Sequence, residues 1–199
     1  MQEIEAKFYV QDLKRIEMCL QDLKAFLIQP RMLETNLRFD LPDGGLRSKG
    51  QVLRLRQDTE AKFTYKGSGK SEQGIVNRTE IEFVVSDFEK AKLFLEALGY
   101  QKILQYNKYR TTYEFEACHI MIDELPYGNF VEIEGEDIAS IHVAAEQLNL
   151  NMQAAISESY SALFEKVRRI MGLKFTDLTF ENFVGIQVSP EHLQVQPAD

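Results

Sequence analysis

The chain lacks the residues on which several common kinds of site depend. It contains no tryptophan, two cysteines and three histidines among 199 residues. Cys19 and Cys118 lie far apart and show no CxxC spacing, so we predict neither a cysteine zinc site nor a redox pair. The histidines, at 119, 142 and 192, form no pair with metal-ligand spacing and no triad. Metal chemistry at this chain would therefore have to use carboxylates.

Long apolar runs and an excess of positive charge are also absent. No apolar run approaches the roughly 18 to 20 residues that span a bilayer, and the first residues lack the basic start and apolar stretch of a signal peptide. We therefore expect a cytoplasmic protein with no membrane partner. The formal net charge of −8 argues against a nucleic-acid partner, because such binding needs a broad basic surface.

Charged residues instead recur at every second position of several short segments. In a β-strand, residues i, i+2 and i+4 share one face. The pattern occurs in Glu3-Ile4-Glu5-Ala6-Lys7, Arg54-Leu55-Arg56, Lys62-Phe63-Thr64-Tyr65-Lys66, Arg78-Thr79-Glu80-Ile81-Glu82-Phe83, Lys108-Tyr109-Arg110 and Val131-Glu132-Ile133-Glu134. A solvated strand face explains any one segment equally well. Their recurrence favours a closed sheet with an apolar exterior covered by helices and a charged interior.

A charged interior requires partners, because removing an ion from water costs several kcal/mol. Hard oxygen ligands select Mg²⁺ or Mn²⁺ over Zn²⁺, and arginine and lysine together suit a polyanion with several phosphoryl groups. The acidic set is Glu3, Glu5, Glu80, Glu82, Asp123, Glu132 and Glu134. The basic set is Lys7, Arg54, Arg56, Lys62, Lys66, Arg78, Lys108 and Arg110. Lys62 and Arg78 are equally well explained as members of salt bridges inside the sheet.

The remaining segments contain helical periodicity and turns. Helices are predicted over 12–26, 86–99, 138–150 and 152–171, the second beginning with a capping box formed by Ser86 and Glu89. Gly69-Lys70-Ser71 is not a phosphate loop, because the first glycine of that motif would fall at Thr64. We predict one domain over 1–172 and a C-terminal extension over 173–199, which packs back at first and then frays beyond Ser189.

The charged segments, taken in order, resemble a known family. ExExK at Glu3 to Lys7, LRLR at Leu53 to Arg56, TYKG at Thr64 to Gly67, ExE at Glu80 to Glu82, KYR at Lys108 to Arg110, and IDE at Ile122 with FVEIEG at Phe130 to Gly135 are similar to the CYTH superfamily of triphosphate tunnel metalloenzymes. The likeness runs from Glu3 to about Gly172. The first motif alone is weak, whereas the ordered series is specific.

The resemblance implies an α+β fold, in which a closed eight-stranded antiparallel β-barrel forms a tunnel with a charged lumen and helices pack outside. It implies one or two Mg²⁺ or Mn²⁺ ions, the first bound by Glu3, Glu5 and Glu134 and the second near Asp123, Glu132 and Glu82. Glu3, Glu5 and Lys7 would act in catalysis, and the whole basic set would bind substrate phosphates.

Three functions fit this resemblance. The first is metal-dependent hydrolysis of a triphosphate, either inorganic tripolyphosphate, a nucleoside triphosphate or thiamine triphosphate. The second is class IV adenylate cyclase activity, which makes cyclic AMP and pyrophosphate from ATP. Such cyclases carry a His-Phe segment after the first helix, and residues 32–39 contain no histidine. The third is binding of polyphosphate or nucleotide without catalysis. The oligomeric state stays open, with a homodimer as one form.

Overall fold

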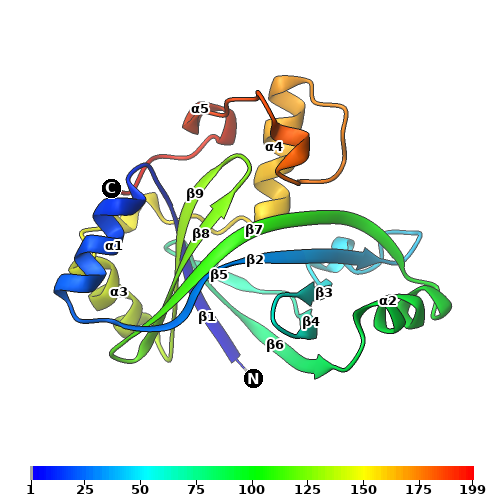
Figure 1. Ribbon diagram of the computed structural model, residues 1–199, viewed down its shortest axis with the longest axis horizontal. Helices are drawn as coiled ribbons and strands as arrows, with labels where there is room; N and C mark the ends of the chain where they lie inside the picture. The colour runs from blue at the N-terminus through cyan, green and yellow to red at the C-terminus, as the bar shows by residue number, and fades with distance from the viewer. Residues whose placement is uncertain (1) are drawn as a thin grey trace.

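The computed structural model describes residues 2–199, and its main feature is one antiparallel sheet that closes on itself (Figure 1). The strands are β1 (Gln2–Val10), β2 (Phe26–Asp40), β3 (Val52–Gln57), β4 (Ala61–Lys66), β5 (Lys70–Glu72), β6 (Ile75–Val85), β7 (Gln101–Phe115), β8 (Cys118–Leu125) and β9 (Gly128–Gly135). Neighbours follow the order β1-β9-β8-β7-β2-β3-β4-β6, and β6 pairs with β1 again. Eight strands thus form a ring, and the short strand β5 lies outside it, paired antiparallel with β6 alone. The predicted tunnel-like α+β fold is confirmed.

Helices cover the outside of the ring. They are α1 (Leu13–Asp22), α2 (Phe88–Ala97), α3 (Ile138–Gln147), α4 (Tyr160–Met171) and α5 (Pro190–Leu193), with short 3₁₀ turns at Arg47–Lys49, Met152–Ala154 and Glu181–Phe183. Within residues 2–199, no helix is both long and apolar enough to cross a membrane.

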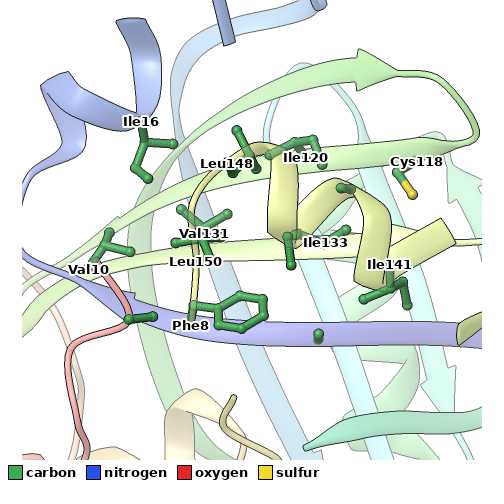
Figure 2. Packing of buried hydrophobic residues seen from close by; sticks show 14 of the residues in the cluster. Phe8, Val10, Ile16, Cys118, Ile120, Val131, Ile133, Ile141, Leu148 and Leu150 are labelled. Atoms are coloured by element: carbon green, nitrogen blue, oxygen red, sulfur yellow. The ribbon is translucent and has the colours of Figure 1, made fainter. Parts of the chain in front are cut away.

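The alternating sequence of β1 explains how one strand serves both the core and the tunnel. Ala6, Phe8 and Val10 are almost fully buried against α1 and α3, where Ile16 and Ile141 meet them (Figure 2). Glu3, Glu5 and Lys7, on the other face of β1, line the inside of the ring. Burial of the apolar face fixes the register, because a shift by one residue would turn every charge into this core.

Helix α2 covers the outer face of β2 and β3 in a smaller cluster, in which Phe39 and Leu55 pack against Leu95. The predicted capping box of Ser86 and Glu89 is wrong. The cap is Asp87, whose carboxylate accepts a hydrogen bond from the backbone N–H of Lys90 at 3.0 Å. The helix therefore begins one residue later than predicted, after Asp87, and aspartate is among the preferred N-cap residues.

The helix predicted over 152–171 is divided into two parts. A 3₁₀ turn ends at Ala154, and α4 begins after Ser159, whose side chain caps it. Between them the backbone N–H of Ile156 donates to the carbonyl oxygen of Lys7 at 2.8 Å. This bond to β1 replaces a helical one, so the segment before α4 lies against the ring.

The C-terminal segment also packs against the body. Leu178 and Leu193 are fully buried beside α4, and the backbone N–H of Ala198 donates to the carbonyl of Tyr9. The Asp199 carboxylate accepts from the backbone N–H of Gln11 at 2.9 Å. The polar composition after Ser189 predicts a frayed end, whereas these contacts hold it on β1. The division into a domain and an extension at 172 stays a prediction.

Candidate functional site

The ring encloses a cavity of about 860 Å³ lined mainly by charged side chains. They come from alternate positions of the strands, whose other positions pack into the apolar clusters. The predicted residues on this lining are Glu3, Glu5, Lys7, Arg54, Arg56, Lys62, Lys66, Arg78, Glu80, Glu82, Lys108, Arg110, Glu132 and Glu134. Asp123 is fully buried behind it and contacts two of the lining cations. The structure therefore brings the whole predicted set together.

Three carboxylates and three cations form a set that we call the paired group: Glu34, Asp123, Glu132, Lys7, Lys108 and Arg110. Asp123 accepts from Lys108 Nζ at 2.9 Å and from Arg110 Nε at 2.6 Å. Arg110 also pairs with Glu132, which lies 3.3 Å from Lys7 Nζ. Every charge in this group has a partner of opposite sign inside the protein.

Glu34 shows how strongly these cations act. Its carboxylate is 1% exposed and lies 3.5 Å from Lys108 Nζ and from Arg56. Burial alone would raise the pKa of this carboxyl, but Lys108, Arg110 and Arg56 outweigh burial and lower the pKa to about 2. Burial would also raise the pKa of Glu132. Lys7 and Arg110 outweigh burial and hold this pKa well below its usual range.

Four carboxylates and two cations form a second set, the acidic group: Glu3, Glu5, Glu80, Glu134, Lys66 and Arg78. Lys66 Nζ lies 2.5 Å from Glu3 and 3.1 Å from Glu80. Arg78 lies 2.7 Å from both Glu3 and Glu5. Glu134 makes no hydrogen bond or salt bridge with any residue in 2–199.

Burial, together with the surplus of negative charge, raises the pKa of Glu134 to about 7. Burial is the largest cause, and the neighbouring Glu3, Glu80 and Glu5 add to it, while Lys66 opposes it. A carboxyl with this pKa marks a place where a further positive charge would be stabilised.

Arg54, Arg56, Lys62 and Glu82 connect neighbouring strands beside these two groups. Glu82 accepts from Thr64 Oγ1 at 2.7 Å and from Arg56 at 3.1 Å. It also lies 3.5 Å from Arg54 and 4.0 Å from Lys62. Glu82 is thus bound by cations, and Lys62 and Arg78 do form the salt bridges that the sequence left open.

The oxygen donors of the cavity suit a hard divalent cation. His119 is the one histidine on the lining, its side chain is exposed, and no cysteine contributes. In the described part of the chain, no three carboxylate, histidine or cysteine groups are gathered around one point as metal ligands. Lys66 and Arg78 hold Glu3 and Glu5 instead. The uncompensated charge at Glu134 nevertheless fits Mg²⁺ or Mn²⁺, with phosphate oxygens supplying further ligands.

Helix α4 contributes a side chain to the lumen that the sequence did not reveal. Tyr160 donates its hydroxyl hydrogen to Asp123 at 2.8 Å, and its ring lies 4.5 Å from Lys7 Nζ. Figure 1 shows the start of α4 beside β7, at one side of the ring. Periodicity predicted this segment as an outer helix, and nothing in its sequence marks the one turn that reaches inward.

Sequence reasoning also missed the lumen face of β2. Glu34, Asn36 and Arg38 occupy alternate positions, with Thr35 and Leu37 between them in the strand. Glu34 and Arg38 line the cavity. The signal was the same two-residue alternation seen elsewhere, but residues 34–38 were not among the charged segments predicted from the sequence.

Comparisons with known proteins agree with this architecture. The CYTH domain matches residues 1–162. Comparison with curated protein sequences finds no match. Among solved structures, a protein of Vibrio parahaemolyticus described as a candidate adenylate cyclase is 20% identical, covers 82% of this chain and 97% of its own, and gives a TM-score of 0.71.

Two further structures show the same fold. A protein of Pyrococcus horikoshii is 25% identical over 82% of this chain and 99% of that chain, with a TM-score of 0.67. A candidate adenylyl cyclase of Hippeastrum, for which a dominant triphosphatase activity is described, is 18% identical over 82% and 95%, with a TM-score of 0.59.

The family match extends from β1 into the first residues of α4 and so includes all strands of the ring and the paired and acidic groups. Members of this family are mostly triphosphate tunnel enzymes and typically use divalent metal ions. The chain belongs to the CYTH family.

Proposed function

We propose that the chain hydrolyses triphosphate compounds inside the ring, with Mg²⁺ or Mn²⁺ as cofactor. The observation that carries this proposal is the cavity of about 860 Å³, in which many cations and carboxylates meet. A triphosphate carries several negative charges along a short chain, and a narrow lined tunnel can contact each phosphoryl group from more than one side. The substrates considered are inorganic tripolyphosphate, a nucleoside triphosphate and thiamine triphosphate.

The cations are the proposed ligands of the phosphate chain. Arg54, Arg56 and Arg110 offer forked donors that bind phosphate oxygens in pairs, and Lys7, Lys66 and Lys108 add point charges. Lys62 and Arg78 lie at the same lining and are proposed as weaker contributors. Because Lys7 and Lys108 are already held by Glu132 and Asp123, these two side chains would change position little when substrate binds.

The carboxylates are the proposed metal ligands. Glu3, Glu5 and Glu134 would hold one ion, and Glu82, Asp123 and Glu132 would lie near a second. A divalent ion bound there neutralises charge that develops on the phosphate oxygens. A carboxylate of the first set orients the attacking water, and Lys7 holds the phosphoryl group that is attacked. Release of Glu3 and Glu5 from Lys66 and Arg78 accompanies binding, because those cations then turn to the substrate.

The Hippeastrum protein supports hydrolysis over cyclisation, because its description combines a cyclase assignment with a dominant triphosphatase activity. The Vibrio parahaemolyticus protein supports the second candidate, adenylate cyclase, by its description. The same ions and cations serve both reactions, which differ in whether water or the ribose hydroxyl attacks. Binding without catalysis is the third alternative.

The deciding experiment incubates the purified protein with tripolyphosphate, ATP or thiamine triphosphate, each with Mg²⁺ or Mn²⁺. Orthophosphate, pyrophosphate and cyclic AMP are measured separately, with a chelator as the metal-free control. Orthophosphate without cyclic AMP supports the proposed hydrolase. Cyclic AMP with equal pyrophosphate would establish the cyclase, and tight binding without product would establish the binding protein.

A further inference from the structure

Arg38 differs from the other cations of the cavity because no carboxylate pairs with it. The eight cations predicted from the sequence each form at least one salt bridge, whereas Arg38 forms none with the residues in 2–199. Its side chain lines the cavity from β2. Burial lowers the pKa of Arg38 most, and Arg54 and Arg78 lower it further, while Tyr106 and Asp40 act in the opposite direction without outweighing them. An unbalanced guanidinium in this position is stabilised by an anion from outside the protein.

Asp40, the acidic residue on the same face of β2 as Arg38, is bound by backbone N–H groups and does not form a salt bridge with Arg38. Asp40 lies two residues further along β2, but its carboxylate accepts from the backbone N–H groups of Leu41 and Leu46, both at 2.8 Å, and of Arg47 at 3.2 Å. These bonds fix the turn after β2 and hold Asp40 on the backbone. The lack of an internal partner for Arg38 is thus built into the local fold.

Two serine hydroxyl groups at the start of α4 lie next to the guanidinium of Arg38. Its Nη1 donates to Ser161 Oγ at 2.9 Å, and Ser161 Oγ lies 3.0 Å from Ser159 Oγ. Ser159 is the N-cap of α4, so the positive end of a twelve-residue helix begins at the same place. The Nε of Arg38 is buried and has no hydrogen-bond partner. Ser157, Ser159 and Ser161 all line the cavity.

Asn36, two residues before Arg38 on β2, also carries a side chain without hydrogen-bond partners. It shares the lumen-facing phase of Arg38 on β2, is completely buried, and neither atom of its amide has a hydrogen-bond partner. Buried amides are rarely left without partners, because each missing bond costs about 1–3 kcal/mol. Asn36 does not line the cavity, so an oxygen-rich ligand there would satisfy Arg38 directly and would not reach the amide of Asn36.

We propose that Arg38, with Ser159 and Ser161 at the start of α4, forms a separate subsite for a phosphoryl group. Arg38 pairs in register with Arg54, so the subsite continues the proposed phosphate track by one position. This inference rests on the proposed function and deepens it, because it makes linear polyphosphates longer than three units the preferred class. The group bound is either the terminal phosphoryl of such a chain or free orthophosphate.

The test measures affinity by calorimetry with a chelator present, so that binding is read without turnover. The ligands are tripolyphosphate, tetrapolyphosphate and orthophosphate, and the variants are Arg38→Met and Ser161→Ala. Arg169→Met is the matched control, because Arg169 is an exposed cation further along the same helix. Thermal unfolding of each variant reports whether it is folded.

For a terminal phosphoryl group, we expect Arg38→Met to weaken tetrapolyphosphate binding about tenfold or more, and tripolyphosphate binding less than threefold. For free orthophosphate, the variant instead weakens orthophosphate binding about tenfold and leaves the ratio of the two polyphosphates as in the wild type. Either result supports the subsite. Ser161→Ala should weaken binding of whichever ligand Arg38→Met affects, by about threefold. Arg169→Met should leave the affinities for all three ligands as in the wild type.

Equal losses for both polyphosphates with unchanged orthophosphate binding would overturn the proposal, as would no change at all. If Arg38→Met does not fold, unchanged affinities in Ser161→Ala overturn it. Failure of the proposed function looks different, because a wild-type protein that binds these ligands and releases no phosphate with Mg²⁺ or Mn²⁺ contradicts hydrolysis alone.

Discussion

The paired group and the acidic group lie in one cavity, yet they solve the problem of buried charge in different ways. Around Glu34 and Asp123 each carboxylate meets a cation of the protein, and the pKa of Glu34 falls to about 2 against the effect of burial. Around Glu134 the carboxylates outnumber the cations, and burial with Glu3 raises its pKa to about 7. The first region is complete without a ligand, whereas the second is balanced only when a positive charge is added.

The largest expected effect is on turnover, from removing one charge of the acidic group. Glu5→Gln keeps the size of the side chain and removes a proposed metal ligand, so we expect triphosphate hydrolysis to fall about 100-fold or more. Phosphate release from tripolyphosphate with Mg²⁺ measures it. Arg78 keeps its bond to Glu3, so the fold should persist. Glu146→Gln, an exposed change on α3, is the control, and full activity of Glu5→Gln would remove Glu5 from the metal site.

The next effect is on stability, from breaking the paired group. Asp123 is fully buried and holds Lys108, Arg110 and Tyr160. Asp123→Asn leaves two buried cations partly uncompensated, and we expect the free energy of unfolding to fall by about 3 kcal/mol. Urea denaturation measures this change.

Glu134→Gln is the matched substitution in the acidic group. It breaks no salt bridge, so we expect it to change the free energy of unfolding by less than about 1 kcal/mol. Equal losses of stability in the two variants would contradict the distinction between the two groups.

Acid should affect the paired group in a defined interval. The pKa of Glu34 is about 2 in the folded chain, against an ordinary value of 4.5, because Lys108, Arg110 and Arg56 outweigh burial. A lowered folded pKa stabilises the protein above the unfolded value, so this contribution is complete above about pH 4.5 and is lost as the pH falls toward 2. Urea denaturation at several pH values between 5 and 2.5 gives the free energy of unfolding as a function of pH. We expect this free energy to change less steeply with pH in Glu34→Gln than in the wild type. Identical slopes would exclude Glu34 as a source of the acid sensitivity.

The smallest expected effect concerns Arg56, a cation beside the paired group. Arg56 contacts Glu34 of the paired group at 3.5 Å and Glu82 at 3.1 Å. Arg56→Ala removes a charge-assisted contact to phosphate, and we expect the half-saturating triphosphate concentration to rise about tenfold. Initial rates over a range of substrate concentrations measure it. An unchanged value would remove Arg56 from the phosphate track.

The sequence predicted the lumen well because its alternation is chemical as well as periodic. Glu5 and Lys7 alternate with Ala6 and Phe8, and that pattern alone decides which face of β1 meets the helices. The pattern could not predict which carboxylate meets which cation, because pairing depends on strand register. Lys66 meets Glu3 across 63 residues of sequence, for example.

The residues missed from the sequence came from two different causes. Arg38 and Glu34 followed the same alternation, but residues 34–38 were not among the charged segments predicted from the sequence, and extending that pattern to them would have found both. Tyr160 reaches Asp123 because a turn of chain between Ala154 and Ser159 bonds to β1, which no local pattern predicts. The helix caps were resolved only by hydrogen-bond geometry, as Asp87 shows.

The pairing that completes the ring has a consequence for how the protein folds. β1 joins β9, so Glu5 lies opposite Glu134 although about two thirds of the chain separates them. Contacts of such long sequence separation form late, since the entropy of closing a long loop must be overcome first, and antiparallel proteins rich in them fold in milliseconds to seconds. Because Glu3 and Glu5 lie on that strand, we expect the acidic group to be assembled only late in folding.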